Sequence, residues 1–478
     1  MFSVVVAGCT GALTTNDLPD PDGGITTVFF DEDDMQGRHL LGERPDQLGP
    51  AGGIFHFRVG VGATLAAQGP TPATPAHLSV AGAGPSGNDG AHLIVDTGTA
   101  TYSGSAVELK DMVMNGIGGG QLRIRGFVEG AASTSYELDY LGPNEKLWTD
   151  YCGGIGGGAI PLQGSFTRER IHEDVPNTIT FACRNGVAMK CDGWGYHAGT
   201  GGPADIFWQH HQACIQMANA AYCGAGPEGL PFTREETPIV IEDFRAGYAK
   251  GPPTLTSPAQ FPGDPDTYYF EAAWRPGGQP PVCLSKLRWA ALRPGACANL
   301  KDPRTDPEGL FCDDLSYHRM KDLGALIING SKMMDAPIHR WSNGTDVVTT
   351  IRGFYVNYFG DESNSTPPFP GYTRYLGSDG MILRNLTGTL DEATDMVPLY
   401  VQHAPGNSEL VVSDGVALPG HIYDPARTGP DFEGYAFKSP TRVPGLKALN
   451  VCPNAAGYDT TIRPCGSVAG PMYALPAP

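Results

Sequence analysis

Apolar and polar residues alternate over several short stretches of the chain, and this period of two residues predicts β-strands. The clearest run extends from Phe55 to Leu65, where every second residue is apolar. Shorter runs, separated by glycine clusters, predict further strands at residues 92–96, 121–128, 135–140 and 177–182. We therefore expect the first part of the chain to be mostly β-sheet.

One segment has the 3.6-residue period of a helix instead. Apolar or small residues recur from Phe207 to Ala221, Asp205 precedes them as an N-cap, and Gly224 follows as a stop signal. This pattern predicts a helix over residues 206–222 whose apolar face packs on the preceding sheet.

The last third of the chain contains a strand, an Asn/Gly turn and a second strand at three places. These units begin at Pro337, Pro398 and Ala448. Strands centred on Gly-Tyr, at residues 371–372 and 434–437, lie between them. The pattern resembles the short tandem repeats with Pro-Leu-Tyr and Gly-Tyr motifs at the ends of secreted bacterial hydrolases and adhesins. It predicts a β-trefoil-like or related module of three divergent units over residues 335–478.

Composition supports a loop-rich β protein with an acidic surface. The chain has 65 Gly and 42 Pro but is 41% hydrophobic, so the Gly and Pro are expected in turns and ordered loops rather than in a disordered chain. Asp and Glu number 51 against 32 Lys and Arg, a net charge of −19. This acidity argues against nucleic acid and anionic membrane surfaces as partners, since both require clustered cations.

The N-terminus resembles the lipobox of bacterial lipoproteins, in which a Cys that follows small residues is acylated. A short apolar run ends in Val-Ala-Gly-Cys at Cys9, which predicts a signal segment over residues 1–9 and lipidation of Cys9. No Lys or Arg precedes this run and it is short for a signal peptide. Either the true start therefore lies upstream or the match is accidental, and the alternative is a buried first strand with an ordinary Cys. Residues 10–50, rich in Asp, Gly and Pro, are expected to form a solvated tether.

Ten further cysteines are spread through loop-rich sequence and contain no C-x-x-C pair, which predicts a disulfide framework of up to five bridges. They are Cys152, Cys183, Cys191, Cys214, Cys223, Cys283, Cys297, Cys312, Cys452 and Cys465. Cys452 with Cys465, and Cys297 with Cys312, are plausible local loops, although spacing alone does not fix the pairing.

Four sequence blocks in a fixed order resemble the ADYC domain. They are Thr180 to Gly186, Lys190 to Tyr196, His211 to Cys214, and Ala220 to Gly224, with Ala221 where the name-giving motif has Asp. The blocks at residues 270–274 and 281–284 are similar to its downstream extension. The resemblance covers residues 90 to about 330 and implies a secreted or lipoprotein-like protein of myxobacterial type, within a body of residues 51–330. It implies no established activity.

Few residues form a pattern that carries chemistry. His210, His211 and Cys214 have helical spacing that would bring them to one metal ion. We expect no metal and no other cofactor, because Cys214 lies in a block that the family resemblance marks as bridged. The chain also lacks a P-loop, a G-x-S-x-G elbow and an H-E-x-x-H helix. Aromatic residues of the C-terminal module are candidate stacking platforms for sugars, with core packing as the alternative: Trp341, Tyr355, Tyr372 and Tyr400.

Together these features predict a mainly β, disulfide-bridged, multi-domain protein with few short helices, located outside the cytoplasm, either secreted or anchored by lipid to the outer membrane or cell surface. The first functional hypothesis is a non-enzymatic binding or adhesion protein that recognises glycan or an envelope component. The second is a secreted hydrolase in which the repeats only target the enzyme. The third is a structural subunit of an extracellular assembly that pairs through the strand at residues 55–65.

Overall fold

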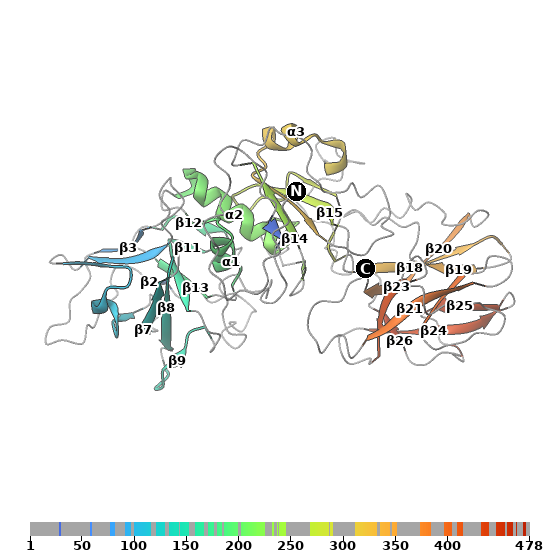
Figure 1. Cartoon of the computed structure of the whole chain (residues 1–478), viewed down its shortest axis with the longest axis horizontal. Helices are drawn as coiled ribbons and strands as arrows, with labels where there is room; N and C mark the ends of the chain where they lie inside the picture. The colour runs from blue at the N-terminus through green and yellow to red at the C-terminus, as the bar shows by residue number, and fades with distance from the viewer. Residues whose placement is uncertain are drawn as a thin grey trace.

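The computed structural model places a first group of strands, two helices, a second sheet and the C-terminal strands one after another along the long axis of the molecule (Figure 1). The described residues are 28–29, 58–59, 77–81, 91–96, 100–115, 121–129, 133–142, 144–152, 158–166, 171–175, 179–183, 186–198, 202–224, 232–233, 237, 239–244, 268–285, 287–289, 311–331, 335–344, 347–350, 373–383, 396–403, 409–413, 432–438, 446–454, 457–461, 465 and 472–474.

The first sheet of the body is antiparallel. Its order is β2 (Arg58–Val59), β13 (Ile179–Cys183), β10 (Ala159–Gln163), β8 (Thr134–Leu141), β7 (Gln121–Glu129) and β6 (Val113–Asn115), with β9 (Thr149–Asp150) paired to β8. A smaller sheet joins β3 (His77–Ala81), β4 (His92–Asp96) and β5 (Thr101–Ser103), and β11 (Ser165–Phe166) pairs with β12 (His172–Glu173). The strands predicted at residues 92–96, 121–128, 135–140 and 177–182 are confirmed as β4, β7, β8 and β13.

Strand β2 is the described part of the alternating run at residues 55–65, and it pairs with β13 of the same chain. The β3–β5 sheet and the first sheet enclose one apolar core, in which Leu93 of β4 lies with Leu122 and Ile124 of β7. Tyr136 of β8 joins them, because its hydroxyl accepts a hydrogen bond from the backbone N–H of Leu93 at 3.0 Å and donates to a carbonyl at 2.8 Å. Burial raises the pKa of Tyr136 to about 12.

The second sheet of the body has the order β1 (Val28–Phe29), β14 (Ile239–Asp243), β17 (Ile327–Ser331), β15 (Tyr269–Trp274) and β16 (Cys283–Leu284). Helix α2 (Ile206–Ala218) contacts α1 (Val187–Gly193), β15 and β17. Short elements complete the body: α3 (Tyr317–Asp322), η2 (Val107–Leu109), η3 (Gly202–Ala204) and η5 (Cys312–Asp314). None of the helices in the described segments is long and apolar enough to span a bilayer.

Helix α2 begins as predicted and ends earlier than predicted. The Asp205 side chain accepts a hydrogen bond from the backbone N–H of Phe207 at 2.9 Å, which confirms the N-cap. The helix stops at Ala218 because Ala220 adopts a positive φ of 50°, and the N–H of Ala221 donates to the carbonyl of Gln216. This is the hydrogen-bonding pattern of a Schellman motif, in which Ala220 takes the place usually held by glycine. The expected stop at Gly224 was therefore wrong.

Disulfide bonds cross-link each part of the molecule. The described pairs are Cys152–Cys183, Cys191–Cys214, Cys283–Cys312 and Cys452–Cys465, and Cys223 is also disulfide-bonded. The local loop predicted between Cys452 and Cys465 is confirmed. The suggested pairing of Cys297 with Cys312 is wrong, because Cys312 bonds Cys283, which brings η5 against the end of the second sheet.

The C-terminal strands form a separate antiparallel sheet (Figure 1). Its hairpins are β18 (Asp335–Ser342) with β19 (Val347–Thr350), β21 (Met396–His403) with β22 (Glu409–Ser413), and β24 (Lys447–Asn454) with β25 (Gly457–Thr461). Each first strand also pairs with a further strand: β18 with β20 (Arg374–Leu383), β21 with β23 (Phe432–Phe437), and β24 with β26 (Met472–Ala474). The predicted strand–turn–strand units are thus confirmed as hairpins.

Candidate functional site

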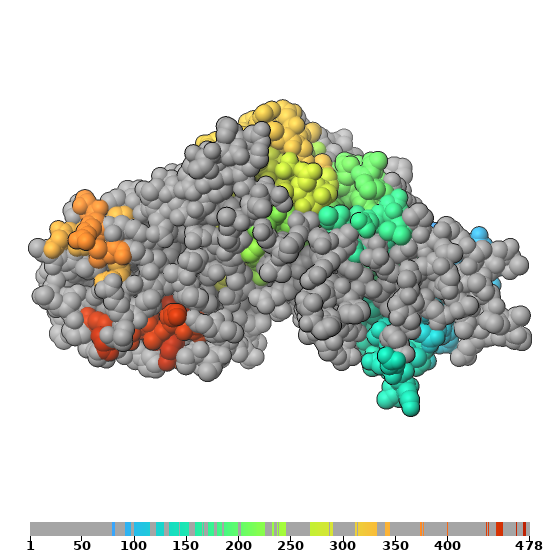
Figure 2. All heavy atoms as spheres, turned by 180° about the vertical axis from the view of Figure 1, so that it is seen from behind, coloured from blue at the N-terminus to red at the C-terminus, as the bar shows by residue number. Residues whose placement is uncertain are grey.

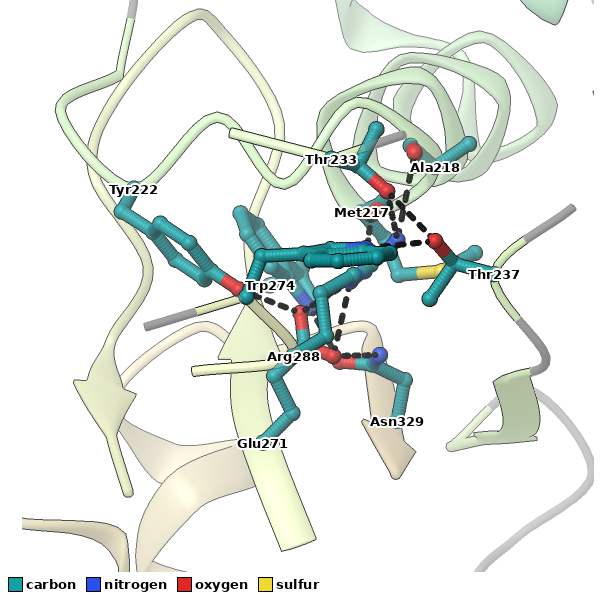
Figure 3. Close-up of polar contacts among 10 residues, drawn as sticks. Met217, Ala218, Tyr222, Thr233, Thr237, Glu271, Trp274, Arg288 and Asn329 are labelled. Carbon is teal, nitrogen blue, oxygen red and sulfur yellow. Dashed lines mark hydrogen bonds and ion pairs between the residues drawn. The ribbon is translucent and has the colours of Figure 1, made fainter. Parts of the chain in front are cut away.

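A buried ionic network lies where α2 ends against the second sheet (Figure 3). The carboxylate of Glu271, on β15, and the guanidinium of Arg288 have 0% and 1% of their side-chain surface exposed and are joined by hydrogen bonds of 2.7–3.1 Å. Tyr222 donates from its hydroxyl to Glu271 at 3.1 Å, and the Asn329 amide donates to the other carboxylate oxygen at 3.0 Å. Each oxygen of Glu271 therefore has more than one donor.

The guanidinium of Arg288 is shared between the carboxylate and the end of the helix. It donates to the backbone carbonyls of Met217 at 2.8 Å and Ala218 at 3.3 Å, and to the hydroxyl of Thr233 at 3.4 Å. These carbonyls belong to the last turn of α2, where the regular helical donors run out, although Met217 also accepts from the backbone N–H of Ala220 at 3.0 Å. A cation at this position also interacts favourably with the helix dipole. Arg288 thus fixes the C-terminus of α2 to β15.

Electrostatics in the network favour a charged Arg288 and a neutral Tyr222. Burial lowers the pKa of Arg288, but Glu271 and Tyr222 raise it more, so the net direction is upward. Burial first, and then the negative charge of Glu271, raise the pKa of the Tyr222 hydroxyl well above its usual range. A buried ion pair with all its hydrogen-bonding capacity filled positions structure, and it offers no free group for chemistry.

A second polar cluster lies around His172, against Trp208 and His211 in the first half of α2. Its imidazole stacks between Phe166 and Trp208, with ring centroids 4.4 and 3.5 Å away. Burial, and then the neighbouring His211, lower the pKa of His172 well below its ordinary value, and burial likewise lowers the pKa of His211. Nε2 of His172 bonds the carbonyl of Gln163 at 2.7 Å. Both imidazoles are therefore neutral parts of the core.

The arrangement closest to a catalytic one lies at α1. Asp192 has one carboxylate oxygen 2.9 Å from Nδ1 of His197, and its other oxygen accepts a hydrogen bond from the hydroxyl of Ser133 at 2.8 Å. A carboxylate on Nδ1 orients an imidazole as in general-base catalysis. The Ser133 proton, however, points at the carboxylate rather than at the imidazole, so this geometry does not activate Ser133 as a nucleophile. His197 has 6% of its surface exposed.

The weak metal alternative at His210, His211 and Cys214 is wrong. The sulfur of Cys214 is bonded to Cys191 and is not available as a thiolate ligand. Nδ1 of His210 hydrogen-bonds a carbonyl of its own helix at 2.8 Å, and Nε2 of His211 bonds the carbonyl of Ala188 at 2.9 Å. These histidines act in packing.

Of the four aromatic residues predicted to stack on sugars, the structure shows the exposure of Trp341 alone. Trp341, on β18, has 3% of its surface exposed, so its ring lies in the interior and does not offer an open face. Tyr400 lies on β21, where it pairs with Val412. Tyr355, Tyr372 and the proposed lipidation site Cys9 lie outside the described residues. Cys297 does so as well.

Sequence reasoning marked the blocks that build the buried network but missed its ion pair. Glu271 stands within the apolar stretch Phe270 to Trp274, and Arg288 stands between Leu287 and Trp289. A single charge inside an apolar strand is a signal of a buried partner, because an isolated buried charge is too costly to keep. That signal is present at Glu271, whereas Arg288 lies outside the strands and follows Lys286 closely, so its position gives no such signal.

The order of these elements, the bonded Cys191, Cys214 and Cys223, and the buried Tyr222 can be compared with known families. Residues 100–290 match the ADYC domain. The comparison with curated proteins and the comparison with solved structures find no match.

The structure shows what the name-giving block of the ADYC domain does in this chain. Ala220 takes the left-handed conformation that ends α2, Tyr222 donates to Glu271, and Cys223 is disulfide-bonded. Ala221, which replaces the expected Asp, supplies a backbone N–H to the cap. The matched region ends before β17, yet β17 pairs with both β14 and β15 and completes their sheet. The folded unit thus extends beyond the match.

Proposed function

We propose that the chain is a binding or adhesion protein of the cell surface, anchored by lipid at Cys9, whose C-terminal module recognises a glycan or another envelope component. Disulfide bonds indicate an oxidising, extracellular environment. The ADYC domain is closed around the Glu271–Arg288 network and acts as a rigid body that carries the module.

The observation that carries this proposal is the equivalent pairing within the C-terminal units. Pro398 and Ala448 begin equivalent segments in the sequence, and they pair with Tyr435 of β23 and Tyr473 of β26. Each of these tyrosines precedes a buried alanine, and Leu399 and Leu449 occupy the same core position. Such equivalence supports a relation between the second and third units. In the first unit Pro337 occupies the corresponding position and pairs with Met381 of β20, so the side chains there differ while the strand pairing is similar, as expected of a divergent β-trefoil-like module.

Contacts between the units extend this pseudo-threefold pattern. Strands β19, β22 and β25, the second strands of the hairpins, contact one another pairwise, and so do β20, β23 and β26. An arrangement of this kind presents similar surfaces several times on one face. Repeated weak sites raise the overall affinity for a repeated ligand such as a polysaccharide.

The proposal can be tested with the purified full-length chain on an array of bacterial-envelope and host glycans. We expect saturable binding that Tyr400→Ala weakens at least tenfold, while Lys447→Ala, a change at an exposed residue of β24, leaves it unchanged. Thermal unfolding of each variant checks that it is folded. Absence of binding to every glycan on the array would contradict the proposal.

A second candidate, a secreted hydrolase, is favoured by the contact between Asp192 and His197. In that case His197 would act as a general base oriented by Asp192. Replacement of His197 by Gln would then abolish turnover of the bound saccharide, whereas the binding proposal expects no turnover before or after the change.

A further inference from the structure

The solvent-facing side of β7, β8 and β9 carries a compact array of charged side chains next to a tryptophan. Leu122 and Ile124 of β7 point into the core, so Arg123 and Arg125 between and beside them point outward. Arg123 forms an ion pair with Asp139 of β8, and its guanidinium lies over the ring of Trp148, 4.7 Å from the centroid. Arg123 therefore lies between the indole of Trp148 and the carboxylate of Asp139.

Arg125 occupies an irregular position that directs its side chain across three strands. The pairing of β7 with β8 shifts between Ile124 and Gly126, which leaves Arg125 as the extra residue of a β-bulge. Its nitrogens reach Asp139 at 3.5 Å, Asp150 of β9 at 3.3 Å and Glu137 at 3.5 Å. A β-bulge of this kind re-aims a side chain and is found next to functional sites.

Stability alone does not explain this array. Asp139 and Asp150 are direct cross-strand partners, and like charges at such positions destabilise a sheet. The side chain of Arg125 has 51% of its surface exposed, and an exposed ion pair contributes little to stability because solvent screens it. The turn before β9 also stands out from the rest of the body, as Figures 1 and 2 both show, and Leu147 in this turn is exposed.

We propose that this face, formed by Arg123, Arg125, Trp148 and Asp150 around the buried carboxylate of Asp139, binds a neutral saccharide. Sugar hydroxyls both donate and accept hydrogen bonds, so they match neighbouring carboxylates and guanidinium groups that are already held in place. The half-exposed indole of Trp148 offers apolar surface to the C–H face of a pyranose ring.

Charge decides which saccharides fit. The two guanidinium groups and the carboxylates of Glu137, Asp139 and Asp150 leave one net negative charge on the face. The chain as a whole carries −19. Sulfated, phosphorylated and other acidic glycans are therefore repelled, and the site takes uncharged sugars. The inference shares its ligand class with the proposed function but assigns a different site.

The test uses the full-length protein and an array of uncharged malto-, cello-, chito-, galacto- and manno-oligosaccharides, followed by calorimetry with the tightest one. We expect Trp148→Ala and the near-isosteric Asp150→Asn to raise the dissociation constant at least tenfold. Glu108→Gln, at an exposed acidic residue of η2, serves as the matched control and should leave the constant unchanged. Thermal unfolding shows whether each variant remains folded, and Asp150→Asn keeps the test decisive if Trp148→Ala does not fold.

The outcomes separate this site from the C-terminal module. Binding that Trp148→Ala and Asp150→Asn abolish, and that Tyr400→Ala leaves intact, supports the site on β7–β9. Binding that only Tyr400→Ala weakens overturns this inference and leaves the proposed function standing. A protein that binds only acidic glycans, or no saccharide at all, also overturns it.

Discussion

Replacing Arg288 by methionine removes the cation from the buried network and leaves the carboxylate of Glu271 without its ionic partner. The methionine fills much of the same volume, so the change tests charge and hydrogen bonding more than packing. The carbonyls of Met217 and Ala218, at the end of α2, each lose a donor in the same step, and Met217 keeps its bond from the backbone N–H of Ala220. All of these groups are buried, so water does not replace the lost bonds.

The expected cost follows from this burial. Removing one partner of a buried ion pair typically destabilises a protein by about 3–5 kcal/mol, because the remaining charge is left uncompensated. Glu271→Gln should cost a similar amount, since Arg288 then keeps its charge without the carboxylate. The double variant carries neither charge. We therefore expect its cost to be lower than the sum of the two single costs by about 2–3 kcal/mol.

Urea unfolding followed by tryptophan fluorescence measures these free energies, with the disulfides intact. Arg319→Met, at an exposed arginine of α3, is the matched control and should change stability by less than about 0.5 kcal/mol. The reasoning is refuted if Arg288→Met costs less than about 1 kcal/mol, or if the two single changes are additive.

Three further predictions concern the same body. Because burial lowers the pKa of His172 and His211 below the ordinary value of about 6.5 for histidine, the stability they contribute is present above that pH and is lost as the pH falls toward the pKa values in the folded protein. The urea midpoint should therefore drop between about pH 7.5 and about pH 5, and less so in His172→Phe; equal pH dependence in both proteins would contradict this. Joint replacement of Cys191 and Cys214 by serine removes a disulfide between residues 23 positions apart in the sequence. It should lower the free energy of unfolding in urea by about 3 kcal/mol, and an unchanged urea midpoint would argue against the bond. Asp205→Ala should cost about 1 kcal/mol through loss of the N-cap, whereas Asp205→Asn, which keeps a capping oxygen, should cost much less.

Local patterns predicted the strands and hairpins well because they depend on residues near each other in the sequence. The alternation at residues 121–128 and 135–140 places side chains on two faces whatever the strand order, and β7 and β8 follow it. The order of strands could not be read in this way. The pairing of β17 with β15 joins segments far apart in the sequence, and nothing local to either one specifies the other.

Each error has a physical cause. The helix end was misplaced because Ala220, which has a Cβ, adopts a conformation that sequence rules reserve for glycine. The network of Glu271 and Arg288 was missed because an ion pair becomes visible only when both charges are brought together by the fold. Trp341 was proposed as an exposed platform because alternation along a strand does not show which of the two faces is buried. In the structure its face of β18 is the buried one.

The central claim is that this chain binds a saccharide and does not convert it. Incubation of the full-length protein with the tightest saccharide from the arrays, followed by mass spectrometry of the sugar, tests this claim most directly. The account predicts saturable binding and recovery of the saccharide with its mass unchanged after prolonged incubation. Shorter products that form with the native protein and disappear in His197→Gln would contradict it and assign hydrolysis to the ADYC domain.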